Sequence, residues 1–184
     1  GNAVAKGFQD HVSEIRIYDV DKDKSTHGYL ETLLSDYIFV CLPTPMTNVE
    51  GGKCNLSIIE KFFEELPTTI EGVIILKSTV PIGTTDILIE KYPYLKIIHN
   101  PEFLTAANAE LDFVEADRHV IGGVDEELIV RVERLYGACF PTIPIYTMKS
   151  KESEAVKYFA NAFLATKVMV FNEMKILCDD ISDV

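Results

Sequence analysis

Three short stretches of the sequence place hydroxyl, carboxyl and amide groups directly after apolar runs. They are VCLPTP (40–45), KSTVPIGTT (77–85) and HNPEFL (99–104). Each stretch alone could be only a turn or a helix cap, because Pro, Thr and Ser favour both. Together they would follow neighbouring parallel strands, whose carboxyl ends are where ligands bind in open α/β sheets. The sequence therefore predicts one shared binding rim.

A lysine and an asparagine near the C-terminus add to this set. Lys157 and Asn161 are four residues apart, so a helix would present both on one face. The residues around them are apolar, and an unpaired ammonium is costly in such surroundings. We therefore expect Lys157 to have a functional partner.

The elements that must position these groups follow from the hydrophobic pattern. Short strand-like runs alternate with helical segments, which is typical of a parallel sheet covered by helices. The expected strands are 14–20, 37–42, 72–78, 95–100, 118–123 and 143–148, and the expected helices are 56–66, 83–92 and 125–139. The fold class is α/β, a Rossmann-like doubly wound and mostly parallel sheet.

Residues 149–180 read as one long helix after the sheet. It is apolar nearly all round between Ala155 and Phe171, which indicates burial on several sides. We expect a dinucleotide-binding domain at 1–148 and, at 149–184, the helix that begins an all-α dimerisation domain. The expected partner is a second copy of the chain.

Composition excludes several classes of protein. The 17 Lys and Arg against 29 Asp and Glu give a formal net charge of −12, so a nucleic-acid partner is not expected. The cysteines form no metal-binding pattern and are expected to be buried and reduced, which indicates a cytoplasmic protein without a metal. The long apolar stretch carries lysines, so no membrane segment is expected.

The N-terminus resembles part of a dinucleotide-binding unit. Gly1 could be the last glycine of a GxGxxG loop opening a helix, and Asp19 would then lie near the end of the next strand. In that interpretation the first strand and most of the glycine-rich loop lie outside the chain. The alternative is that Asp19, Asp21 and Asp23 form a solvated turn.

Taken in order, these motifs resemble the UDP-glucose/GDP-mannose dehydrogenase family over essentially the whole chain. The resemblance rests on VCLPTP, KSTVPIGTT, NPEFL, RHVIGG and the long helix EAVKYFANAFLATKVMVFNE. It implies NAD-dependent oxidation of the C6 hydroxyl of a nucleotide sugar by two hydride transfers, through enzyme-linked thiohemiacetal and thioester intermediates. The substrate would be UDP-glucose and the product UDP-glucuronate, which is used in polysaccharide biosynthesis.

The resemblance also implies catalytic roles. Thr79 would hold a water near the nicotinamide, and Glu102 would act as the acid or base in thioester hydrolysis. Lys157 would stabilise negative charge on the substrate oxygen, with Asn161 hydrogen-bonded to the same region.

The same resemblance implies binding residues. Asp19 would bind the adenosine ribose of NAD, and Gly1, Pro43, Thr44, Pro45 and Thr79 would border the dinucleotide. The substrate would contact Glu102, Phe103, Leu104, Lys157 and Asn161. A second family glutamate is replaced by Ala106, so either Glu102 acts alone or another carboxylate such as Glu110 compensates.

The family's nucleophilic cysteine and its C-terminal nucleotide-sugar domain are expected outside the chain, so these 184 residues alone are expected to be inactive. Two alternatives remain. One is another Rossmann hydroxyacid dehydrogenase, similar to those acting on 6-phosphogluconate. The other is a non-catalytic module that dimerises through its helix.

Overall fold

A mostly parallel sheet forms the centre of the protein. The computed structural model describes residues 1–47, 51–105 and 107–182. Within them, five strands lie in the order of the sequence: β1 (Tyr37–Val40), β2 (Val73–Leu76), β3 (Lys96–His99), β4 (His119–Gly122) and β5 (Ile145–Met148). All neighbours pair in parallel except β3 and β4, which are antiparallel through the pair His99 and Gly122. The expected α/β class is confirmed, with this one reversal of direction.

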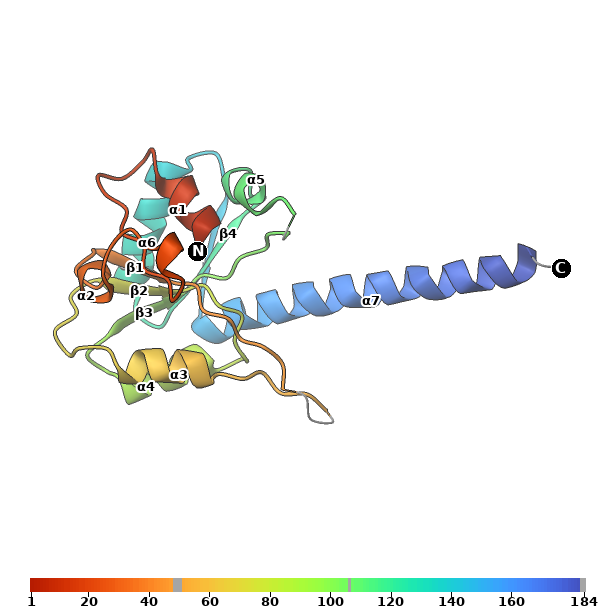
Figure 1. Ribbon diagram of the computed structural model, residues 1–184, viewed down its shortest axis with the longest axis horizontal. Coiled ribbons are helices and arrows are strands. Elements are labelled where there is room, and N and C mark those ends of the chain that lie inside the picture. Colours follow the sequence, from red (N-terminus) through yellow and green to blue (C-terminus); the bar gives the residue numbers. More distant parts are fainter. Residues whose placement is uncertain (48–50, 106, 183–184) are drawn as a thin grey trace.

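Helices cover both faces of the sheet (Figure 1). On one face lie α1 (Asn2–Phe8), α5 (Ala109–Val114) and α6 (Glu126–Cys139), and on the other α3 (Ser57–Glu64) and α4 (Thr84–Lys91). The short helices η1 (Lys22–Lys24) and α2 (Tyr29–Thr32) precede β1. None of η1, α2 and α5 was expected from the sequence, because helices this short show no helical period.

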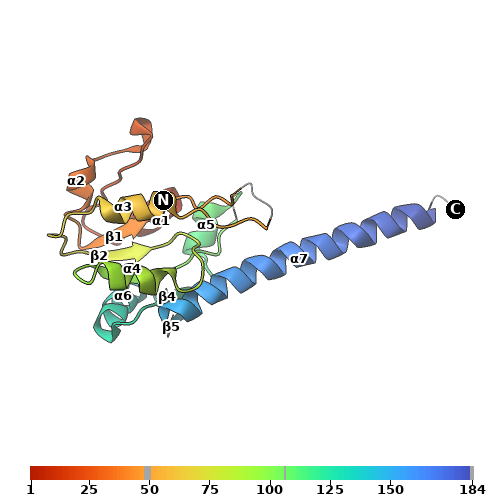
Figure 2. The same cartoon turned by 90° about the horizontal axis from the view of Figure 1, so that it is seen from below.

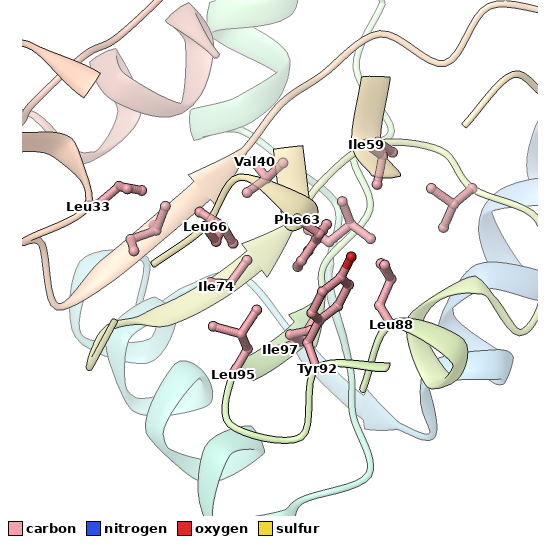
Figure 3. Packing of buried hydrophobic residues seen from close by; sticks show 13 residues of the cluster. Leu33, Val40, Ile59, Phe63, Leu66, Ile74, Leu88, Tyr92, Leu95 and Ile97 are labelled. Carbon is pink, nitrogen blue, oxygen red and sulfur yellow. The ribbon is translucent and has the colours of Figure 1, made fainter. Parts of the chain in front are cut away.

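Two apolar clusters explain why the strands form. The four residues of β2 are fully buried, and they alternate between the clusters on the two faces of the sheet. In the cluster on the α3 and α4 face, Phe63 of α3 and Leu88 of α4 pack near Ile74 (Figure 3). A strand covered on both sides needs a continuous apolar run, which is the pattern that predicted it.

The last helix, α7 (Ser150–Ser182), begins against the sheet and then extends away from it (Figures 1 and 2). Its first turns lie beside β4, β3 and α4. Gly122 of β4 permits this approach, because a Cβ there would lie 2.4 Å from the Ser153 Cβ. Residues 161–181 of α7 are exposed, so nothing in the described chain buries the apolar surface that the sequence predicted to be covered.

Two expectations are wrong. Residues 14–20 do not form a strand. The edge strand β1 pairs only with β2, and the segment 14–20 does not pair with its free edge. A strand needs a neighbour to satisfy its backbone groups, so an alternating pattern alone is insufficient. The cysteines are also not all buried: Cys41 and Cys178 are exposed and Cys54 is partly exposed.

No helix in the described part of the chain is long and apolar enough to cross a membrane.

Candidate functional site

The exits of β1 and β2 are joined by side-chain hydrogen bonds. Ser78 Oγ accepts a hydrogen bond from Leu42 N at 3.0 Å and donates one to Leu42 O at 2.7 Å. Thr44 Oγ1 donates to Thr79 O at 2.7 Å. Two of the three predicted stretches are therefore held together, and Thr79 has a fixed backbone with a partly exposed side chain.

The register of the sheet relates Thr79 to Glu102. Leu76 of β2 pairs with His99 of β3, and these are the last residues of two parallel strands. Thr79 and Glu102 each follow by three residues (79 − 76 and 102 − 99). Both residues thus lie at the same edge of the sheet, as expected for the carboxyl ends of parallel strands.

Lys157 of α7 contacts Glu102 directly. Its Nζ lies 3.1 Å from Glu102 Oε1 and also donates to the main-chain oxygen of Glu102. The Lys157 side chain is 6% exposed and that of Glu102 is 33% exposed. A buried ammonium beside a partly exposed carboxylate gives this edge of the sheet a fixed cation and a group that can exchange protons.

The ring of Phe103 lies close to two cations. Its ring centroid is 4.4 Å from Arg118 Cζ and 5.3 Å from Lys157 Nζ, both within the range of cation–π attraction. Glu102, Phe103 and Leu104 also line a pocket of about 350 Å³. The pocket is bounded on its other side by α5 and the segment leading into β4.

Asn161 is not brought into this group. It lies one helical turn after Lys157, where α7 has left the sheet, and it is exposed. The spacing predicts that Lys157 and Asn161 share one face of the helix. It does not predict how many turns of that face are covered by the sheet and α4.

A buried polar network underlies the site. Lys77 Nζ donates to Asn100 Oδ1 at 2.6 Å and to Asn100 O at 3.0 Å, and Tyr136 OH donates to the same Oδ1 at 2.5 Å. Asn100 Nδ2 donates to Val120 O at 2.6 Å. Burial lowers the pKa of Lys77 to about 8, because a desolvated ammonium is less stable than the neutral amine. This network fixes the backbone two residues before Glu102.

The contacts of α7 with the sheet and with α4 include two residues that sequence reasoning missed. Ser153 Oγ lies 2.8 Å from His99 Nδ1, and Glu154 binds the N-terminus of α4. Burial, with the nearby Lys77 charge, lowers the pKa of His99 to about 4, and His119 behaves in the same way. Ser153, Glu154 and Lys157 lie at helical spacing, which was the available signal.

The geometry near the N-terminus fits a dinucleotide in one respect. A Cβ on Gly1 would lie 3.8 Å from the Cys41 Cβ, so the start of α1 lies beside the exit of β1, where Pro43, Thr44 and Pro45 follow. Asp19 is partly buried, and its Oδ1 accepts a hydrogen bond from Asp21 N at 2.9 Å. This is the local turn that the alternative interpretation expected, and it leaves a carboxylate on the surface.

Two further expectations concern the loop after Glu102. Ala106 lies outside the described residues. Glu110 Oε1 accepts hydrogen bonds from Lys6 at 2.7 Å and from Asn2 at 3.0 Å, so it is engaged with α1. In the described chain no group of three His, Cys, Asp or Glu residues is placed to hold a metal ion.

Comparison with protein families gives two matches. Residues 14–140 match the NAD-binding domain of the UDP-glucose/GDP-mannose dehydrogenase family, and residues 151–183 match its central domain.

Individual proteins with similar sequences are dehydrogenases that act on nucleotide sugars, according to their names. The chain is 33% identical over 156 residues to the UDP-glucose 6-dehydrogenase YwqF of Bacillus subtilis, covering 80% of this chain and 34% of the relative. It is 33% identical over 153 residues to a UDP-N-acetyl-D-mannosamine dehydrogenase of Methanocaldococcus jannaschii, covering 80% and 35%.

Solved structures are also similar. A GDP-mannose dehydrogenase from Pseudomonas aeruginosa superposes with a TM-score of 0.67 at 27% identity, covering 77% of this chain and 35% of that one. A UDP-glucose dehydrogenase from Pyrobaculum islandicum gives a TM-score of 0.65 at 30% identity, covering 78% and 35%. The chain spans about a third of the length of these relatives.

Proposed function

This chain belongs to the UDP-glucose/GDP-mannose dehydrogenase family, and we propose that the protein carrying it oxidises the C6 hydroxyl of a nucleotide sugar to a carboxylate. The cofactor is NAD, since residues 14–140 match the NAD-binding domain of the family. When bound, NAD accepts hydride. The finer proposal is that the substrate is UDP-glucose and the product UDP-glucuronate, in a cytoplasmic enzyme.

One observation carries the proposal: the ammonium of Lys157 is buried against Glu102 at the exit of β3. Oxidation of an alcohol develops negative charge on its oxygen, and a fixed cation with little access to water stabilises that charge most effectively. We therefore assign Lys157 to the substrate oxygen and Glu102 to proton transfer. Asn161 would hydrogen-bond the same region once a further part of the protein covers α7.

Binding residues complete the proposal. Thr79 would hold a water at the edge of the sheet, and the backbone at Phe103 and Leu104 would contact the sugar. Asp19 would bind the adenosine ribose, and its negative charge favours NAD over NADP because it repels a 2′-phosphate. Gly1, Pro43, Thr44 and Pro45 would border the dinucleotide.

We also propose two regions with different tasks. Residues 1–148 would bind NAD, and residues 149–184 would begin a dimerisation domain. The exposed side chains Phe163, Val170, Met174, Leu177 and Ile181 support a homodimer. Their spacing of seven, four, three and four residues makes one apolar stripe along α7 of the kind that pairs helices.

The proposal is tested with the full-length protein and NAD. Formation of NADH would be followed with UDP-glucose, GDP-mannose, UDP-N-acetylmannosamine and 6-phosphogluconate as separate substrates. We expect UDP-glucose to be oxidised with two NADH per sugar. Preferential oxidation of another nucleotide sugar would correct the substrate only, whereas turnover of 6-phosphogluconate alone would replace the proposed function.

A further inference from the structure

Glu154 of α7 is a fully buried carboxylate that caps another helix. Its Oε2 accepts a hydrogen bond from Gly83 N at 2.5 Å. Its Oε1 accepts from Thr85 N and from Thr85 Oγ1, both at 2.7 Å. A buried carboxylate requires such donors, because burial without them is costly. Three hydrogen bonds therefore hold the start of α4 to α7.

The start of α4 depends on this contact. Its N-cap residue is Gly83, which has no side chain to bind the free amide groups of the first turn. Gly83 has a φ of 97°, a left-handed conformation that glycine adopts most readily. Glu154 thus supplies from a distant part of the sequence what a serine or aspartate usually supplies locally.

The capped turn is continuous with the candidate site. Thr79 precedes Gly83 by four residues. Val80, which follows Thr79, and Thr84, which follows Gly83, are both buried. Thr84 Oγ1 donates to Pro81 O at 2.6 Å, which closes the turn further. A movement of Gly83 would therefore reach Thr79 through only three intervening residues, of which Val80 is buried and Ile82 is exposed.

The capping residue and the candidate catalytic lysine share one helix. Glu154 and Lys157 are three residues apart on α7, so they lie on the same face about one turn apart. Glu154 binds the segment after β2, and Lys157 binds the segment after β3. The first turns of α7 therefore set the positions of Thr79 and Glu102 relative to each other.

We infer that Glu154 is a positioning residue, which holds the Thr79 turn in register with the Lys157–Glu102 pair. Its catalytic consequence rests on the function proposed above. The contact of Lys151 Nζ with Asp86 Oδ2, at 3.1 Å, joins the same two helices. The side chain of Lys151 is 62% exposed and that of Asp86 is 24% exposed. An ion pair with a solvent-exposed ammonium contributes little, so the buried Glu154 is the residue that fixes the geometry.

The first experiment needs no activity. Amide hydrogen exchange would be measured by NMR in wild type, Glu154→Gln, Thr85→Val and the control Lys151→Gln. Glutamine keeps the size of Glu154 but presents an NH₂ group where an acceptor is needed. Exchange at Gly83 and Thr85 should become about tenfold faster or more in Glu154→Gln. The amide of Ile75, in the centre of the sheet, reports global opening and corrects for any general loss of stability.

Thr85→Val removes one of the three hydrogen bonds with little change of shape, and it serves if Glu154→Gln does not fold. It should accelerate exchange at Gly83 and Thr85 by a smaller factor, and Lys151→Gln should leave both amides unchanged. Unchanged exchange in both Glu154→Gln and Thr85→Val, relative to Ile75, would overturn the inference.

The second experiment is turnover by the full-length protein. In Glu154→Gln we expect kcat to fall about tenfold or more, with KM for the sugar within about threefold of wild type, because a small displacement of reacting groups mainly affects the chemical step. Faster exchange with an unchanged kcat would overturn the positioning role. A wild-type protein that oxidises no nucleotide sugar would refute the proposed function, and the exchange measurement would still decide whether Glu154 holds the turn.

Discussion

Lys157 Nζ lies 3.1 Å from Glu102 Oε1 and also donates to the main-chain oxygen of the same residue. The ammonium therefore fixes both the side chain and the backbone of Glu102. Lys157 lies in α7 and Glu102 lies in the loop after β3, 55 positions earlier in the sequence. The contact therefore joins the helix that leaves the sheet to this loop.

The first prediction concerns this pair. Lys157→Met keeps much of the aliphatic side chain and removes the charge. On the proposed function, the full-length protein should lose about 10²-fold in kcat, since the developing negative charge loses its fixed cation. NADH formation at saturating substrate measures it. Lys167→Met, at an exposed position of the same helix, is the matched control and should retain the wild-type rate. A Lys157→Met enzyme that is folded and fully active would remove Lys157 from the mechanism.

The second prediction concerns pH and stability. The pKa values of His99 and His119 are lowered to about 4 by burial and by the Lys77 charge, whereas an unfolded histidine titrates near 6.5. The unfolded chain therefore binds more protons between pH 6.5 and 4. The contribution of each neutral buried histidine to the free energy of unfolding is fully present above about pH 6.5. It is lost as the pH drops towards 4, by up to about 3 kcal/mol for each histidine.

Urea unfolding at pH values from 7.5 to 4.5 measures this dependence. In His119→Phe the part of the slope that comes from the two buried histidines should be roughly halved, because His99 still titrates. Phenylalanine suits the position, where the ring of His119 packs against Tyr136 at a centroid distance of 4.5 Å. An unchanged slope in a folded His119→Phe variant would show that His119 is not held neutral by the fold.

The sequence predicted the centre of the fold better than its edges. A buried run such as Val73–Leu76 carries its own evidence, because both faces of the strand need apolar side chains. The segment 14–20 has an alternating pattern, but a strand exists only where a second strand meets it. The reversed direction of β4 was likewise invisible, since direction depends on how the chain returns to the sheet and not on local composition.

The site shows the same division. The stretches that contain Thr79 and Glu102 were predicted from their position after apolar runs, and Lys157 from helical spacing, whereas Thr79 and Glu102 themselves were named by the family resemblance. The structure brings Lys157 to Glu102. The partnership of Glu154 with Thr85 joins residues 69 positions apart and requires the three-dimensional arrangement of α4 and α7. The exposure of Asn161 was also beyond the sequence, because it depends on where α7 leaves the sheet.

The third prediction concerns the approach of α7 to the sheet. In Gly122→Ala the new Cβ would lie 2.4 Å from Ser153 Cβ, so α7 would have to move. We expect a loss of about 1–3 kcal/mol in the free energy of unfolding, which urea denaturation measures. In the control Gly137→Ala the Cβ would lie 3.8 Å from Ile145 Cδ1, an ordinary contact between α6 and β5. That variant should be unchanged or up to about 1 kcal/mol more stable. Equal stabilities of the two variants would contradict close packing at Gly122.

The fourth prediction concerns the exposed apolar stripe of α7. Phe163 is 69% exposed and Met174 is 54% exposed, and an extended apolar surface of this kind is typical of an interface. If two copies pair through it, Phe163→Glu with Met174→Glu should give monomers, because burying two carboxylates without partners is unfavourable. Light scattering coupled to size-exclusion chromatography measures the mass. Asn172→Glu adds a charge at an exposed position on the opposite face of α7, between the two, and tests whether charge alone separates the subunits. A double variant that keeps the mass of the wild-type dimer would place the interface elsewhere.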